Sequence, residues 1–320
     1  MRAMKRLAIV IAAVLSVGVL SGCDPRAGIP DNGAVTGMFV SNARGGGPFA
    51  AVTATMEGRL GYTMGGHRIY QGDFLVNSTS DTQLRDDAAH GRTSYFSVHS
   101  PTDAITCTWG CFAYQTGLMN QLAQQLGAYS HPIVFVLDHE PDVGTTPHGT
   151  RQEYSAMEAN MFHAIRQYAP AVSTAINFGY YKLWKGQLTQ AQYAEYLPSD
   201  RTLLDIIGVD PYNDATSPAG SASLQNLMTP WIAFAADENK PVVIFEVGTR
   251  LAAGNKPQWV QAALAYVKSQ PRIKGILWFH ANTHATDPVN DYWIDGNGTD
   301  TQSFNAYKTS TSDPYFLKGG

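Results

Sequence analysis

The sequence lacks the features that mark several large classes of protein. Its 320 residues hold 22 Lys and Arg against 26 Asp and Glu, for a formal net charge of -4, so the chain has no basic excess with which to bind nucleic acid. It contains neither the nucleotide-binding pattern G-x-G-x-x-G after a strand nor a phosphate-binding loop. In "HEPDV", Val143 stands where a zinc protease would carry its second histidine. We therefore expect no cofactor, no metal and no nucleic-acid partner.

The N-terminal residues have the layout of an export signal. Three of the first six residues are basic, and the apolar stretch that follows is too short for an ordinary membrane span. The stretch ends in "LSGC", which resembles the bacterial lipobox. We predict a lipoprotein signal peptide over residues 1–22, lipidation of Cys23 and a short tether over 23–33. The protein would then be exported and held at the cell envelope by a lipid anchor in the membrane, or secreted if the lipobox is not used. Fatty-acid labelling should be lost in Cys23→Ala.

Cysteine is scarce: the chain has 3, and Cys23 accounts for one of them. The other two, Cys107 and Cys111, stand close together in "TCTWGC". Export would place them in an oxidising compartment, where a local disulfide is the leading interpretation. A zinc site is a poor alternative, because tetrahedral sites recruit four ligands, or three and a water. We therefore predict a Cys107–Cys111 bridge, with a reduced pair as the alternative.

The rest of the chain alternates apolar runs with segments of helical spacing. Unbroken runs such as "IVFVL" are typical of parallel strands that are covered on both faces. Eight such units in roughly 250 to 300 residues favour a (β/α)8 barrel. No linker or internal repeat divides the chain, so we predict an α/β fold, a single-domain (β/α)8 TIM barrel over residues 34–320. The expected strands end near Ser41, Phe74, His99, Asp138, Phe178, Asp210, Glu246 and Phe279.

Two of the expected helices carry clear end signals. One begins at Thr150, which has Glu153 three residues later as in a capping box, and stops before Pro170. Another has Pro257 near its start and Pro271 just beyond its end. Both occupy intervals between expected strands, as the barrel requires.

Two of the expected strands end in a carboxylate. "IVFVLDHEPD" delivers Glu140 to the end of the fourth strand, and "PVVIFEVGTR" delivers Glu246 to the end of the seventh. In a barrel the C-terminal ends of all strands meet at one face, where the chemistry takes place. Two carboxylic groups facing each other across that mouth are what the cleavage of a glycosidic bond requires.

The motifs around these glutamates resemble glycoside hydrolase family 26, a (β/α)8 family of retaining glycosidases. The resemblance rests on "LDHEPD", "IIGVDPYN", "KPVVIFEVGT" and "PRIKGILWFHAN", in that order, with "YWIDG" and "FNAYK" after them. It implies that Glu140 is the acid/base and Glu246 the nucleophile. In the two-step mechanism Glu246 attacks the anomeric carbon, while Glu140 protonates the leaving oxygen and later activates water.

The same resemblance implies substrate-binding roles for other residues. His139 precedes the acid/base as in the family, and His99 stands where the family often has a histidine in the donor-side subsite. Tyr212 matches the aromatic residue beside the nucleophile, and Trp278 matches the one under the sugar. Each also has a simpler interpretation: the two aromatic residues could be ordinary packing, and His99 could be only a hydrogen-bonded structural residue.

Trp109 lies between the two cysteines of the loop after the third expected strand. We predict that the disulfide places it at the rim of the cleft, where an indole can stack on a sugar ring. The alternative is a tryptophan that only covers the barrel.

The sequence therefore predicts a monomeric glycosidase whose partner is a β-linked polysaccharide or oligosaccharide. An endo-β-1,4-mannanase is the first candidate, and a β-glucanase or β-xylanase on the same fold is the alternative. Pro141 and Asp142, and the absence of an arginine and a proline before His139, depart from the mannanase pattern. A non-catalytic carbohydrate-binding lipoprotein is a second class, although a pure binder has no need for both glutamates.

Overall fold

The structure is a computed structural model. The predicted signal peptide, residues 23–27 of the tether with Cys23, and Cys107 lie outside the part of the chain that it describes, so the statements made about them stay predictions. Within the described part, no helix combines the length and the apolar character needed to cross a membrane. The described residues are 28–41, 48–101, 108–143, 149–281 and 292–320.

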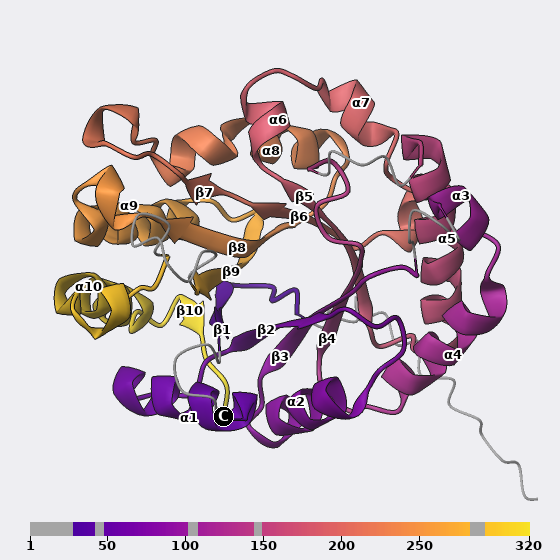
Figure 1. Ribbon diagram of the computed structural model, residues 1–320, viewed down its shortest axis with the longest axis horizontal. Coiled ribbons are helices and arrows are strands. Elements are labelled where there is room, and N and C mark those ends of the chain that lie inside the picture. The colour runs from indigo at the N-terminus through magenta and orange to yellow at the C-terminus, as the bar shows by residue number, and fades with distance from the viewer. Residues whose placement is uncertain (1–27, 42–47, 102–107, 144–148, 282–291) are drawn as a thin grey trace, which may run out of the picture.

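Eight parallel strands close into a barrel with the helices outside it (Figure 1). Each strand pairs with the next around the ring, and β9 closes the ring because it pairs with both β1 and β8. The predicted (β/α)8 fold is therefore confirmed. The barrel strands are β1 (Ala34–Val40), β2 (Gly66–Gln71), β3 (Thr93–Val98), β4 (Ile133–Leu137), β5 (Ser173–Gly179), β6 (Ile206–Asp210), β8 (Val242–Thr249) and β9 (Ile273–His280).

Two short strands extend the barrel without entering the ring. β7 (Tyr212–Asn213) pairs with the end of β8, and β10 (Phe316–Leu317) pairs with β1. The pairing of β7 with β8 matters for the site, because it holds Tyr212 opposite Gly248, two residues after Glu246.

Helices connect the strands around the outside, and their ends follow the signals in the sequence. α5 begins after Thr150, whose side chain forms the predicted capping box with Glu153, and α9 begins with Pro257 in its first turn. The helices of the described part are α1 (Phe49–Leu60), α2 (Ser78–Ala89), α3 (Trp109–Phe112), α4 (Thr116–Gly127), α5 (Arg151–Tyr168), α6 (Tyr181–Trp184), α7 (Gln190–Ala194), α8 (Leu224–Asp237), α9 (Lys256–Ser269) and α10 (Thr301–Thr311).

Side chains on the strands alternate between two cores. One row points into the barrel, and the other packs against the helices, because successive residues of a strand face opposite sides. The outer core is by far the larger and includes residues such as Ile244 and Trp278. The inner core contains Val35, Tyr95, Val134, Val136, Ala175, Ile206, Val243, Phe245 and Leu277.

Candidate active site

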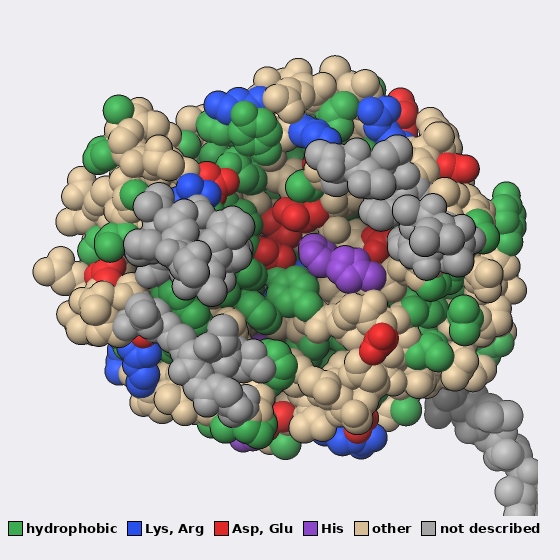
Figure 2. All heavy atoms as spheres, viewed as in Figure 1, with side chains coloured by type: hydrophobic (Ala, Val, Ile, Leu, Met, Phe, Trp, Pro, Cys, Tyr) green, Lys and Arg blue, Asp and Glu red, His purple; other side chains and the backbone are tan. Residues whose placement is uncertain are grey.

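The C-terminal ends of the barrel strands meet at one face of the molecule, as expected for this fold. Figure 2 shows that this face is hollowed at its centre, with acidic and histidine side chains gathered in the hollow. The two predicted catalytic residues reach this face from opposite parts of the chain. Glu140 lies in the turn after β4, and Glu246 lies within β8.

A β-bulge directs Glu246 into the barrel mouth. Ile244 pairs with Ile276 and Val247 pairs with Trp278, so two residues of β8, Phe245 and Glu246, stand opposite a single residue of β9. Without the extra residue, a side chain next to the inward-facing Phe245 would point toward the helices. The bulge is therefore what turns the carboxylate toward the site.

Three side chains then hold the Glu246 carboxylate, which is 7% exposed. The Tyr70 hydroxyl donates to Oε1, and the Tyr212 hydroxyl donates to Oε2 at 2.5 Å. The fully buried Arg68 guanidinium lies 3.8 Å from Oε1. Two donors and a cation suit a negatively charged carboxylate with a fixed orientation, which is what a nucleophile needs.

Glu140 has a different environment. Burial first, and then the negative charges of Glu246, Asp142 and Asp214, raise the pKa of its half-buried carboxyl to about 8, against a smaller opposing effect of Arg68. A carboxyl with this pKa keeps its proton at neutral pH and can donate it to a leaving group. The two glutamates therefore have environments suited to different roles.

The two predicted histidines lie beside the glutamates, with their ring centroids 5.1 Å apart. The His139 ring meets Tyr70 edge-on at 5.4 Å, and burial lowers the pKa of His139 to about 4, so its imidazole is neutral. The His99 side chain is 52% exposed with Nδ1 3.2 Å from Asp138 Oδ1, and this hydrogen bond raises its pKa. His99 therefore offers an open polar edge to the hollow.

Of the two aromatic residues that the resemblance predicted to bind substrate, Tyr212 and Trp278, one lies at the site and the other does not. Tyr212 lies beside Glu246, as the resemblance implied, but the position expected for Trp278 is wrong. The Trp278 indole is 2% exposed, donates to the Tyr292 carbonyl at 2.8 Å and packs edge-on against Trp259 of α9, so it belongs to the outer core. Its neighbour Phe279 points into the barrel instead, where it stacks on Phe39 at 5.3 Å and is partly exposed.

The predicted stacking role of Trp109 is also wrong. The indole is 4% exposed, so it has no open face for a sugar ring. Its Nε1 donates to Asp138 Oδ2 at 3.0 Å, and its ring meets Tyr154 edge-on at 4.9 Å. Trp109 supports the turn that carries Glu140. Cys111 is exposed and forms no disulfide with any described residue, while Cys107 lies outside the described part, so the predicted bridge stays a prediction.

Sequence reasoning missed several residues of the site. Arg68 and Tyr70 come from β2, and Asp214 follows β7. Arg68 gave a signal that could have been used, because it stands within an expected barrel strand, where an arginine is rarely buried without a partner. Asp214 accepts from Tyr180 at 3.2 Å and from Tyr292, and Arg250 lies 3.6 Å from it. Its contacts come from distant segments, so no local pattern could reveal it.

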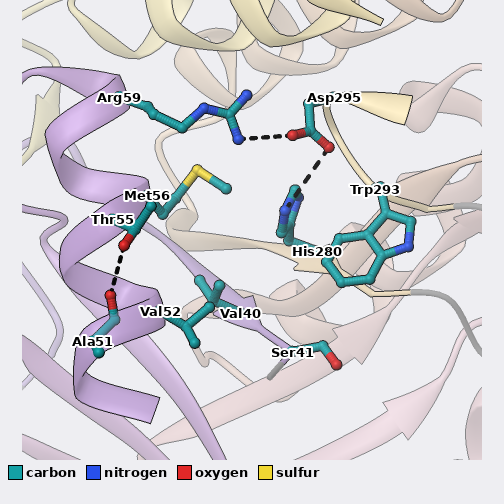
Figure 3. A pocket seen from close by; sticks show the side chains of 10 residues that line it. All are labelled: Val40, Ser41, Ala51, Val52, Thr55, Met56, Arg59, His280, Trp293 and Asp295. Carbon is teal, nitrogen blue, oxygen red and sulfur yellow. Dashed lines mark hydrogen bonds and ion pairs between the residues drawn. The ribbon is translucent and has the colours of Figure 1, made fainter. Parts of the chain in front are cut away.

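A second cavity of about 350 Å³ lies away from the two glutamates. Figure 3 shows its lining, with Arg59 of α1 paired to Asp295 at 2.7 Å and the ring of His280 beneath them. The His280 ring stands edge-on to Trp293 at 4.6 Å and accepts from the Ile294 amide. Arg59 and His280 of this lining both pair with Asp295, so we assign no reaction to this cavity.

No protein-family model matches the sequence, and no curated protein matches it. Solved structures do. An endo-β-1,4-mannanase of Cellulomonas fimi superposes with a TM-score of 0.64 at 17% identity, over 89% of this chain and 72% of that one. A modular endo-β-1,4-mannanase from the same organism, whose structure explains the product specificity of glycoside hydrolase family 26 mannanases, superposes with a TM-score of 0.63 at 17% identity, over the same shares of the two chains.

Two further neighbours are enzymes with other substrates. A xyloglucan-specific GH5 endo-β-1,4-glucanase from a metagenomic library, in complex with cellotriose, matches with a TM-score of 0.60 at 16% identity, over 88% of this chain and 96% of that one. Fungal β-1,4-galactanases match with a TM-score of 0.59 at 15% identity, over 87% and 99%. At these identities the likeness establishes the fold, and the family suggested by the sequence motifs is among the neighbours.

Proposed function

We propose that this protein is a retaining glycosidase that cleaves a β-linked polysaccharide, with Glu246 as the nucleophile and Glu140 as the acid/base. The observation that carries the proposal is the contrast between the two carboxyl groups at one barrel mouth. Glu246 is held by two hydroxyl donors and faces a guanidinium, while the pKa of Glu140 is raised to about 8 by burial and neighbouring carboxylates. A pair of carboxyls with separated properties assigns the nucleophile and the acid.

The reaction proceeds in two displacements at the anomeric carbon. In the first, a Glu246 oxygen bonds to that carbon, the glycosidic C–O bond breaks, and the Glu140 proton passes to the departing oxygen. In the second, the Glu140 carboxylate takes a proton from water, whose oxygen attacks the same carbon and releases Glu246. Tyr70 and Tyr212 each donate to a different oxygen of Glu246 and so hold the carboxylate in one orientation for attack.

β-1,4-Mannan is the first substrate that we propose, with β-glucan and xylan as the alternatives. The sequence motifs support mannan, and so does the mannanase among the structural neighbours. Within the site, Phe279 takes the place that Trp278 was expected to fill, and its partly exposed ring can lie against the sugar at the cleavage point. Asp214, whose side chain is 43% exposed, can accept hydrogen bonds from sugar hydroxyls at the same mouth.

The two glutamate variants should fail in different ways. Glu246→Ala should lose on the order of 10⁴-fold or more with every substrate, because no covalent intermediate can form. Glu140→Ala should lose about 10²- to 10⁴-fold with poor leaving groups but far less with a dinitrophenyl glycoside, which needs no proton. With that substrate it should accumulate a glycosyl-enzyme on Glu246, and azide should rescue turnover with a β-configured product.

The measurement is steady-state hydrolysis on β-mannan, β-glucan and xylan and on matching aryl glycosides, with the product configuration read by NMR. Glu195→Ala, at an exposed position on the outside of the barrel, is the matched control and should keep wild-type rates. Equal losses in both variants without azide rescue would contradict the assigned roles. A wild type that binds these glycans but cleaves none of them would favour the non-catalytic binder.

A further inference from the structure

The turn that carries Glu140 has an unusual backbone. Asp138 has φ 47° and Glu140 has φ 55°, although neither is glycine. The left-handed region costs an L-residue roughly 1 to 2 kcal/mol. Such conformations persist at functional sites only when the surrounding contacts fix them. The side chains that contact this turn therefore determine where Glu140 points.

The Glu140 carboxyl is not fixed by hydrogen bonds of its own. No described residue donates a hydrogen bond to it, in contrast to Glu246 with its two tyrosines. The residue is held through its backbone instead, because its amide donates to the Asn177 carbonyl at 2.7 Å and its carbonyl accepts from the Val143 amide at 3.0 Å. Its position must then be set by the residues on either side in the turn.

Asp138 fixes the turn on one side. Its carboxylate is 7% exposed and accepts from the Ser100 amide at 2.9 Å, from the Ser100 hydroxyl and from the Trp109 indole at 3.0 Å. His99 Nδ1 lies 3.2 Å from the same group. These contacts join the turn to the end of β3 and to α3.

Asp142 fixes the turn on the other side. Its carboxylate is 2% exposed and accepts from the Gly179 amide at 2.9 Å and from the Tyr193 hydroxyl at 2.7 Å. Lys182 donates to its main-chain carbonyl. These contacts join the turn to the end of β5 and to α6 and α7.

We propose that Asp138 and Asp142 are paired positioning residues, which hold the turn between them in the one conformation that aims Glu140 at the leaving oxygen. The proposal rests on the role proposed above for Glu140. It gives a reason for the sequence Asp-His-Glu-Pro-Asp, in which a buried carboxylate stands two residues before and two residues after the acid/base. A displacement of about 1 Å can cost about 10²-fold in rate, so such anchoring affects catalysis directly.

Asp142 has a second effect that Asp138 lacks. Glu140 faces Glu246 from β8, Asp210 from β6, Asp214 after β7 and Arg68 from β2, together with Asp142 from its own turn. The negative charge of Asp142 is one of the causes that raise the pKa of Glu140, whereas Asp138 is not among the main causes. Neutralising the two anchors should therefore give different pH profiles.

Alanine variants test the positioning. Asp138→Ala and Asp142→Ala should each lose about 10²-fold or more on aryl glycosides with poor leaving groups and less than about 10-fold on a dinitrophenyl glycoside, which does not need the acid. Both should still form a covalent adduct on Glu246 with a 2-deoxy-2-fluoro glycoside. Equal losses on the two leaving groups would mean a general structural defect and would overturn the proposal.

Asparagine variants separate charge from position, because the amide keeps one oxygen acceptor and nearly the same shape. Asp142→Asn should move the basic limb of the pH–rate profile down by roughly half a unit to one unit, and Asp138→Asn should leave that limb in place. An equal shift in both variants, or none in Asp142→Asn, would overturn the assignment of the second effect to Asp142.

Hydrogen exchange tests the anchoring in the resting protein, without any substrate. The Glu140 amide, which donates to Asn177, should exchange at least about 10-fold faster in both alanine variants, because the turn opens more often. Unchanged exchange in both would overturn the proposal even if the protein is a glycosidase. Faster exchange in a protein that cleaves no glycan would instead overturn the proposed function and leave the anchoring of the turn supported.

Discussion

The two ends of this barrel both bury acidic side chains, but these side chains have opposite surroundings at the two ends. At the N-terminal end, Arg92 is 1% exposed and binds Glu57 through two hydrogen bonds of 2.8 and 2.7 Å. The same guanidinium donates to Asp86 at 2.7 Å and to Asp87 at 3.2 Å. These acidic groups gather around a cation.

Asp87 shows the result of this arrangement. Its carboxylate is completely buried, and burial acts to raise its pKa. The charge of His67 and hydrogen bonds from His67 and Ser94, with Arg92 nearby, outweigh burial and hold the pKa of Asp87 below its ordinary value. The group stays ionised because the protein surrounds it with donors.

At the C-terminal end, carboxyl groups face one another. Burial, followed by the charges of Glu246 and Glu140, raises the pKa of Asp210 well above its ordinary value, and the pKa of Glu140 is raised to about 8. Within the described part of the chain, Asp210 Oδ1 and Arg68 Nη2 have no hydrogen-bond partner. The same residue types thus contribute to stability when opposite charges meet, and to reactivity when like charges meet.

The largest expected change in stability comes from removing the buried cation at the N-terminal end of the barrel. Arg92→Met should lower the free energy of unfolding by about 3 to 5 kcal/mol, because it leaves several buried carboxylates without their cation. The catalytic constants of the molecules that remain folded should not change, since Arg92 lies at the other end of the barrel. Urea unfolding and steady-state kinetics measure the two quantities.

Arg85→Met is the matched control for that experiment. Arg85 also pairs with an aspartate, at 2.9 Å, but its side chain is 71% exposed. Its loss should change the free energy of unfolding very little, because water screens an exposed pair. A similar small cost for Arg92→Met would show that the buried cluster does not stabilise the N-terminal end as described.

A smaller effect is expected from relieving the repulsion at the C-terminal end. The pKa of Glu140 is raised from 4.5 to about 8, so between these pH values the folded protein keeps a proton that the unfolded chain releases. The contribution of Glu140 to the free energy of unfolding is therefore most favourable below about pH 4.5, and it is lost as the pH rises through about 8. Glu140→Gln does not titrate, so it should become more stable than the wild type as the pH rises.

The difference should grow from about pH 4.5, level off above about pH 8 and reach roughly 2 to 3 kcal/mol, because water partly screens a half-buried group. Thermal or urea unfolding across this pH range measures it. Glu195→Gln, on an exposed side chain, is the control. A constant difference between Glu140→Gln and the wild type would contradict the proposed environment of Glu140.

Some features of the protein could be predicted from local sequence. Six of the eight predicted strand ends lie within one residue of the observed ones, whereas β2 ends three residues before Phe74 and β8 runs three residues past Glu246. These ends and the capping box of Thr150 each depend on a short pattern that the fold preserved. These patterns report hydrophobic runs, caps and strand termini, which are decided by residues close together in the chain. Tyr212 could be placed as well, because the resemblance covers its surroundings.

Other features depended on contacts between distant segments. Trp109 was expected to face a sugar but is held by Asp138, and only the packing of α3 against the turn after β4 decides this. The pKa of Glu140 depends on groups from β8 and from the segment after β7 as well as on its own turn. No window of sequence contains these groups together, so the raised pKa of Glu140 could not be predicted from local sequence, and the acid/base role proposed for it came from the resemblance.

The sequence by itself determined that "ILWFH" is a buried strand, but the tertiary structure decided which of its rings faces the site. A strand covered on both faces carries apolar residues at every position, so the alternation that would reveal its inward row is absent. Closure of the ring by β9 between β1 and β8 turned Phe279 inward and Trp278 toward the helices. The bulge in β8 added one residue and turned Glu246 inward beside Phe245, a change of facing that only the pairing of two distant strands can produce.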